Sequence, residues 1–256
     1  MSSANDLAGV RGVVLDVEGT TTPVSFVYDV LFPYARQRLR AFLRDHAEDS
    51  SVREAFRLLR LEWSGDEEAK KQIPRGACPR GSDSDRRARD DAGDAPDDMP
   101  LYLEWLMDRD RKSTGLKIIQ GEIWRGGFES GALRGEVYPD VKPALERWHA
   151  AGRVVSIYSS GSATAQRLLF AHSTAGDLTP LIAHHFDTTV GPKRSSESYS
   201  AIARALNMPA AGLLFVSDVD AELVAARDAG MCTSLCVRSG DAPGTTSPVI
   251  RSFDEL

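Results

Sequence analysis

A regular alternation of strand and helix patterns through the second half of the chain constrains its fold more than any other feature. Short apolar runs typical of buried strands alternate there with segments of helical spacing. The strands are expected at residues 154–159, 186–190, 213–217 and 233–237, and the helices at 139–150, 163–170, 197–206 and 221–229. Such alternation predicts a doubly wound α/β fold, in which helices cover both faces of a parallel sheet.

One more strand of this sheet is expected far upstream. Residues 10–16 form an apolar run that ends at Asp16 and is soon followed by Gly19, as in a buried strand that leads into a loop. The next hundred or so residues show helical spacing without strand alternation. Helices are expected there at about residues 25–46, 51–63, 99–110 and 114–124.

This order predicts two domains. Residues 1–24 and 135–256 form the α/β core, and residues 25–134 form an all-helical cap inserted after the first strand. Within the cap, residues 75–98 contain many Arg and Asp but no large aliphatic or aromatic residue. Because such a segment buries too little surface to offset its ordering entropy, we expect a mobile, solvated loop rather than a binding tail.

The composition excludes several classes of function. The chain has 256 residues, 42% hydrophobic and 27% charged, which is typical of a soluble globular protein. Its net charge of -6 provides no positive field for nucleic acid or an anionic membrane. It has neither a signal sequence nor an apolar stretch of the roughly 20 residues that a membrane span needs. Its three cysteines show no zinc-binding spacing. We therefore expect a cytoplasmic protein without nucleic-acid or membrane partners.

Three of the expected strands end in acidic or hydroxyl residues. In open parallel sheets, the ligand crevice lies outside the carboxyl ends of the strands. The groups expected to converge there are Asp16, the pair Ser159 and Ser160, and the pair Ser217 and Asp218. Carboxylates that face one another need a cation to stay ionised, and hard oxygen donors without His or Cys favour magnesium over zinc. Asp218 directly ends its strand and is preferred as a ligand over Asp220 and Glu222.

The first loop carries a pair of acids suited to phosphoryl transfer. A carboxylate such as Asp16 can attack phosphorus and form an aspartyl-phosphate. Glu18, two residues on, can protonate the leaving oxygen and later deprotonate water, a contribution of about 10²–10⁴-fold.

Donors for the phosphate oxygens are also expected. Ser159 and Ser160 precede a helix and offer hydroxyls and backbone amides. The segment from Ser159 to Ser162 could also simply cap that helix, and the two roles can coexist. Lys193 also lies just before a helix, from which its charge could reach the phosphate or Asp16.

These residues resemble the four motifs of the haloacid dehalogenase superfamily of phosphohydrolases. The segment from Asp16 to Thr20 is similar to the first motif, Ser159 to the second, Lys193 to the third, and Asp218 with Glu222 to the fourth. Most superfamily phosphatases carry Asp where this chain has Glu18. A Glu there, together with similarity along nearly the whole chain, resembles the enolase-phosphatases (acireductone synthases) of methionine salvage.

The resemblance implies a specific reaction. Enolase-phosphatases convert 2,3-diketo-5-methylthiopentyl-1-phosphate by enolisation and loss of phosphate to the acireductone 1,2-dihydroxy-3-keto-5-methylthiopentene. It further implies that Mg²⁺ is held by Asp16, Glu18 and Asp218, and that Ser159, Ser160 and Lys193 contact the substrate. Glu18 could bind the metal through its side chain or through its backbone carbonyl. The family resemblance also suggests a monomer.

Two alternatives stay open at this stage. One is a phosphatase of the same fold that acts on another small phosphate ester, because fold alone does not fix the substrate. The other is a phospho-accepting signalling module, which also combines an acidic pocket, a hydroxyl and a Lys on a parallel sheet. Such modules lack a large helical insertion after the first acidic strand.

Overall fold

The structure is a computed structural model that describes residues 7–73, 99–242 and 244–256. The expected mobile loop, residues 75–98, lies outside the described residues. Contacts divide the chain into two compact units, one of residues 1–31 with 127–256 and one of residues 32–126. We call them the α/β unit and the helical unit. The expected boundaries of core and cap, at residues 25 and 134, stay a prediction.

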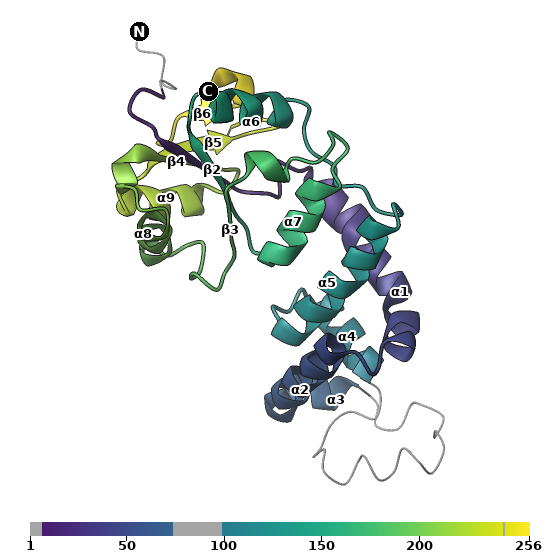
Figure 1. Ribbon diagram of the computed structural model, residues 1–256. Helices are drawn as coiled ribbons and strands as arrows, with labels where there is room; N and C mark the ends of the chain where they lie inside the picture. Colours follow the sequence, from purple (N-terminus) through teal and green to yellow (C-terminus); the bar gives the residue numbers. More distant parts are fainter. Residues whose placement is uncertain (1–6, 74–98, 243) are drawn as a thin grey trace, which may run out of the picture. The chain divides into compact units, whose positions relative to one another are not determined.

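The α/β unit is built on a six-stranded sheet in the order β3-β2-β1-β4-β5-β6, and every pairing is parallel (Figure 1). The strands are β1 (Gly12–Leu15), β2 (Val154–Tyr158), β3 (His184–Phe186), β4 (Leu213–Ser217), β5 (Cys232–Cys236) and β6 (Val249–Ile250). β1, the strand farthest upstream, lies in the middle of the sheet and is wholly buried. A strand covered on both faces is expected to be continuously apolar, which explains the run that precedes Asp16.

Helices cover both faces of this sheet. α6 (Val141–Ala150) and α7 (Ala163–Ala171) pack beside β2 and β3, and α8 (Ser196–Ala205) and α9 (Asp220–Asp228) lie on the opposite face (Figure 1). The α8–α9 face buries Tyr199, Ile202 and Leu223 against Phe215 of β4. The reversal of strand order at β1 places the helices of the two halves on opposite faces, because crossovers are right-handed. The doubly wound α/β prediction is confirmed.

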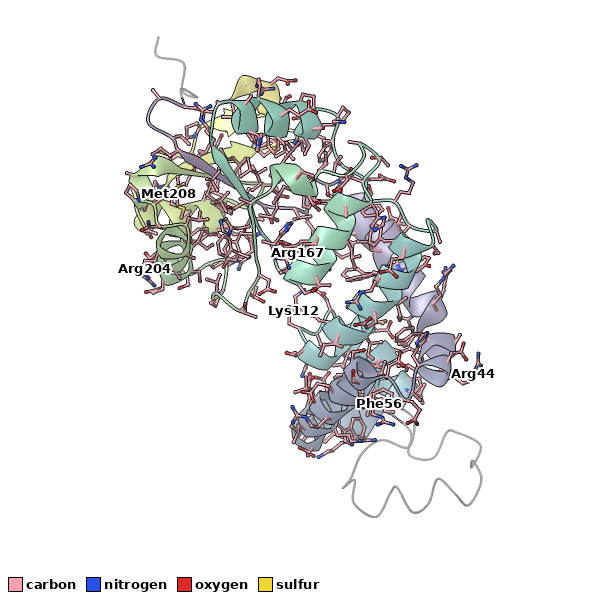
Figure 2. The ribbon with its side chains drawn as sticks, in the orientation of Figure 1. Arg44, Phe56, Lys112, Arg167, Arg204 and Met208 are labelled. Atoms are coloured by element: carbon pink, nitrogen blue, oxygen red, sulfur yellow. The ribbon has the colours of Figure 1, made fainter. Side chains whose placement is uncertain are left out.

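The helical unit follows a π-helical turn, Phe26–Leu31, that leaves the α/β unit. Its helices are α1 (Phe32–Asp45), α2 (Ser50–Gly65), α3 (Glu67–Gln72), α4 (Met99–Asp108) and α5 (Thr114–Glu129). They share one apolar core that includes Leu39, Trp63 and Tyr102. Arg44, on the wet side of α1, is exposed and points away from the helix (Figure 2). The alternation of buried and charged positions along α1 is that of an amphipathic helix.

The strand expected at residues 186–190 was wrong. The structure has β3 at His184–Phe186, followed by a turn in which Asp187 Oδ1 accepts hydrogen bonds from the amide and hydroxyl of Thr189, at 2.9 and 2.6 Å. A side chain that bonds the backbone two residues on competes with a strand ladder, so the β-branched residues 188–190 do not extend β3. In the described part of the chain, no helix is both long and apolar enough to cross a membrane.

Candidate active site

The carboxyl ends of β2, β1 and β4 lie side by side. Leu15 at the end of β1 is level with Ile157 of β2 and Val216 of β4. The chain therefore delivers Asp16, Ser159 and Ser217 to one edge of the sheet, where the strand order reverses. Such a switch point is where open α/β sheets bind ligands.

Asp16 is buried and held through both carboxylate oxygens. Its Oδ1 accepts a hydrogen bond from the Val17 amide at 2.7 Å and lies 2.6 Å from Lys193 Nζ. Its Oδ2 accepts from Ser217 Oγ at 3.1 Å. Groups on three separate segments thus fix the orientation of this carboxylate, as a positioned nucleophile requires.

Lys193 is shared between two acids. Its Nζ lies 2.6 Å from Asp16 Oδ1 and 2.6 Å from Glu222 Oε2, and its side chain is only 11% exposed. Burial lowers the pKa of Lys193, but the charges of Asp16 and Glu222 outweigh burial, and the net pKa is raised. The lysine is therefore a cation at neutral pH. Burial and the nearby charge of Asp16 raise the pKa of Glu222. The charge of Lys193 lowers it, but the net pKa stays raised.

Ser217 and Glu222 were expected near the site, but the sequence did not predict their contacts with Asp16 and Lys193. The Ser217 hydroxyl lies 3.1 Å from Asp16 Oδ2 and 3.0 Å from Glu222 Oε2, and it accepts from the Val219 amide. The two residues connect the lysine to the end of β4. The sequence signals for Glu222 are its place with Asp218 in the fourth motif and its position in the first turn of α9.

Three hydroxyl groups anchor the loop that carries Lys193. The carbonyls of Gly191, Pro192 and Lys193 accept hydrogen bonds from Tyr158 Oη, Ser198 Oγ and Tyr199 Oη, at 2.8, 2.8 and 2.7 Å. Gly191 has a φ of 139°, and a Cβ there would lie 2.2 Å from Ser198 Oγ. The loop is thus packed too tightly for a larger residue at position 191.

Ser159 and Ser160 follow β2, next to Asp16. Ser159 is buried, and its Oγ accepts from the Gly161 amide at 3.2 Å, which leaves its own proton for donation. Ser160 is half-buried. The cap of α7 is a different serine, because Ser162 Oγ accepts from the Ala165 amide. Of the segment 159–162, Ser162 therefore caps the helix, and Ser159 and Ser160 do not.

Asp218 lies against Gly19, the residue after Glu18. Gly19 has a φ of 70°, and a Cβ there would lie 2.1 Å from Asp218 Oδ2. Only glycine lets the Asp218 carboxylate approach the loop backbone this closely. Asp218 is exposed as a residue, yet desolvation of its carboxyl group and the charge of Asp16 raise its pKa to about 6. Glu18 is half-buried and forms an isolated bridge with Thr22.

The charge balance of this edge favours a bound cation. Asp16, Glu222 and Asp218 supply three carboxylates, and Lys193 supplies one positive charge. Among residues 7–73, 99–242 and 244–256, no group of three or more His, Cys, Asp or Glu side chains is gathered for a metal. Mg²⁺ does not need such a group, because it keeps several waters and uses one or two carboxylates. The carboxylates of Asp16 and Asp218, together with the backbone carbonyl of Glu18, fit that donor set.

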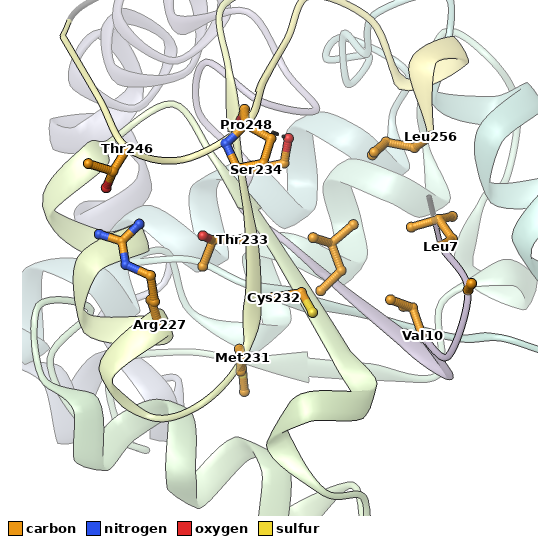
Figure 3. Close-up of a pocket in the computed structure, with 12 residues that line it drawn as sticks. Leu7, Val10, Arg227, Met231, Cys232, Thr233, Ser234, Thr246, Pro248 and Leu256 are labelled. Atoms are coloured by element: carbon orange, nitrogen blue, oxygen red, sulfur yellow. Dashed lines mark hydrogen bonds between the residues drawn. The ribbon is translucent and has the colours of Figure 1, made fainter. Parts of the chain in front are cut away.

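A separate hollow lies at the opposite edge of the sheet (Figure 3). It has a volume of about 320 Å³ and is lined by residues at the amino ends of β1, β4 and β5, among them Val10, Leu214 and Cys232. Most of its lining is apolar, with Arg227 as its charged member. Because Asp16 and Asp218 lie at the carboxyl ends of the same strands, this hollow is no part of the acidic site.

Comparisons with known proteins agree with this geometry. A family model of haloacid dehalogenase-like hydrolases matches residues 10–230. "Enolase-phosphatase E1" of Synechococcus elongatus is 47% identical over 249 residues, which cover 96% of this chain and 98% of that protein. The protein of the same name from Azotobacter vinelandii is 44% identical and covers 96% of this chain and 97% of its own length.

The chain belongs to the enolase-phosphatase branch of the haloacid dehalogenase-like hydrolases. This confirms the family that the motifs around Asp16 and Glu18 indicated, and with it an enzyme of the phosphatase class. The crystal structure of the UTR4 protein from Saccharomyces cerevisiae is similar to this chain, with a TM-score of 0.72 and 29% identity. The match covers 96% of this chain and all of the UTR4 chain. An L-2-haloacid dehalogenase, with a TM-score of 0.52 and 16% identity, shares the fold alone.

Proposed function

We propose that this protein is a magnesium-dependent enolase-phosphatase that converts 2,3-diketo-5-methylthiopentyl-1-phosphate to the acireductone and phosphate. One observation carries the proposal: a buried Asp16 oriented by Lys193, Ser217 and the Val17 amide at the switch point of the sheet. The names of the relatives support the substrate. The sequence favours a cytoplasmic monomer, and this stays a prediction.

Each proposed step follows from the chemistry of the residues. An oxygen of Asp16 attacks phosphorus, the bond from phosphorus to the ester oxygen breaks, and Glu18 gives that oxygen a proton. Water then attacks the aspartyl-phosphate, Glu18 takes a proton from it, and the bond between phosphorus and Asp16 breaks. Ser159, Ser160 and Lys193 donate to the phosphoryl oxygens, where negative charge has to be stabilised.

Asp16, Asp218 and Glu18 are the residues proposed to hold Mg²⁺. When bound, the ion would neutralise charge on the phosphoryl oxygens. The raised pKa of Asp218 supports this assignment, because a carboxylate that is costly to ionise alone is stabilised by a cation.

The test is simultaneous detection of phosphate and of the enediol by its ultraviolet absorbance, with purified protein, the diketo phosphate and Mg²⁺. Equal amounts of both products are expected, and chelation of the metal should abolish both. Phosphate without enediol would mean that the enzyme only hydrolyses the ester and does not catalyse enolisation, which would favour the first alternative drawn from the sequence. No turnover would overturn the proposal. The signalling alternative has no support, since the match to hydrolases spans residues 10–230.

A further inference from the structure

The loop that carries Asp16 and Glu18 is held by an arginine that follows β5, two strands away from β1 in the sheet. Arg238 lies two residues after β5, and its guanidinium donates two hydrogen bonds to the Thr20 carbonyl, from Nε at 2.9 Å and from Nη2 at 2.6 Å. Its third nitrogen, Nη1, lies 2.6 Å from Asp140 Oδ2. One buried cation therefore joins the first loop to a segment more than a hundred residues away in sequence.

Arg238 is itself rigidly held. Its side chain is 9% exposed, and its guanidinium carbon lies 4.3 Å from the ring centre of Tyr138 and 4.5 Å from that of Phe253. Asp140 Oδ2 also accepts from the Phe253 amide at 2.6 Å and from Ser252 Oγ at 3.2 Å. A planar guanidinium packed against two rings has little freedom to move, and its Nε and Nη2 can both donate to one carbonyl oxygen.

The threonines of this loop are buried, and only some of their polar groups are paired within the loop. Thr20, Thr21 and Thr22 are fully buried, and the hydroxyls of Thr20 and Thr22 make no hydrogen bond. The Thr21 carbonyl accepts from the Tyr138 amide at 3.0 Å, next to the carbonyl that Arg238 holds. Residues outside the loop therefore fix the carbonyls of Thr20 and Thr21. These two residues directly follow Gly19, which lies against Asp218.

We propose that Arg238, held by Asp140, is a positioning residue that sets the turn from Glu18 to Thr20 and so aligns Glu18 for proton transfer to the leaving group. Arg238 acts through the Thr20 carbonyl and not on the substrate. Loss of the guanidinium leaves a buried carbonyl unpaired and lets the turn relax. The proposal rests on Glu18 as the acid of the proposed function.

Two synthetic esters separate a misaligned acid from general damage. The leaving group of 4-nitrophenyl phosphate needs no proton, whereas that of phenyl phosphate does. We expect Arg238→Met to lower kcat/KM for phenyl phosphate by about 10²-fold and for the nitrophenyl ester by less than about fivefold, since proton transfer accounts for the difference. Equal losses on both esters, or no loss, would overturn the proposal. Neither ester is the proposed natural substrate, so a failure on the diketo phosphate would remain a separate result.

Arg147→Met is the matched control. Arg147 also ties down the C-terminal turn, through hydrogen bonds to the Phe253 and Leu256 carbonyls, but it does not touch the first loop. It should leave the ratio of the two kcat/KM values unchanged.

If Arg238→Met does not fold, Asp140→Asn keeps the arginine and removes its charged partner, and a smaller shift of the same ratio is expected. Amide hydrogen exchange of residues 17–22 should rise in the Arg238 and Asp140 variants and not in the Arg147 variant. Unchanged exchange there would contradict the grip on the loop.

Discussion

The two edges of the same sheet are built in opposite ways. At the carboxyl edge, strands β1 and β4 end in a network in which one lysine and one hydroxyl connect two buried carboxylates. At the amino edge, the same strands border a mostly apolar hollow of about 320 Å³ (Figure 3). The residues that line this hollow include no acid, so the arrangement of charge, and not open volume, identifies the place of the chemistry.

The largest difference in kcat is expected between a substitution of Asp16 at the carboxyl edge and one of Cys232 at the amino edge. Asp16→Asn removes the proposed nucleophile at almost unchanged shape and should lower kcat by at least about 10⁴-fold. Cys232→Ser at the amino edge should leave kcat within about twofold of wild type. Steady-state phosphate release measures both. A comparable loss in the Cys232 variant would show that the hollow takes part in the reaction.

Removal of the proposed acid should give the next largest effect. Glu18→Gln should lower kcat by about 10²–10⁴-fold with little change in KM, because a general acid acts in the transition state more than in binding. Kinetics over a range of substrate concentrations would show this separation. A rise in KM at unchanged kcat would assign Glu18 to binding instead.

Substitution of Lys193 tests how much this network contributes to the free energy of unfolding. Lys193→Met leaves Asp16 and Glu222 without their shared cation, and loss of one member of a buried ion pair typically costs about 3–5 kcal/mol. Urea unfolding should show this loss, together with loss of activity. The double variant with Glu222→Gln should recover part of the stability but no activity. Full stability in the single variant would mean that the carboxylates do not need Lys193 in the folded state.

The smallest expected effect lies away from both edges, at His185 on β3. Burial first, then the charges of Arg167 on α7 (Figure 2) and of His184, lower the pKa of His185 from 6.5 to about 4. The unfolded chain therefore binds a proton that the folded chain rejects, and stability falls as the pH drops from about 6.5 towards 4. His185→Gln should remove about 1–2 kcal/mol of this pH dependence, measured by urea unfolding at pH 7 and pH 4.5. An unchanged dependence would assign it to other groups.

Strand ends were predictable where the chain changes abruptly from apolar to polar. β4, Leu213–Ser217, has the bounds expected from the sequence, because a buried parallel strand is continuously apolar and stops at its first polar residues. β6, Val249–Ile250, was not expected, since two residues carry no periodicity. Residues 188–190 gave a false strand because the competing bond is made by the side chain of Asp187.

Within the site, residue types were predictable and their contacts were not. The motifs indicated Asp16, Lys193 and Asp218 as members of one site, but nothing in them says that Ser217 bonds Asp16 across 201 residues of sequence. The contact between Arg238 and Thr20 spans 218 residues and depends on the packing of two rings around the guanidinium. Such contacts follow from the tertiary structure alone.

The three hydroxyls that hold the carbonyls of residues 191–193 have a consequence for the length of that loop. Each carbonyl is matched to one hydroxyl, so one inserted or deleted residue would shift every partner by a place. The ammonium group would then start from a different point and miss Asp16, although every residue of the site would still be present in the chain. In a chimaera that takes this loop from another phosphatase, the number of residues in the loop would therefore matter more than their identity.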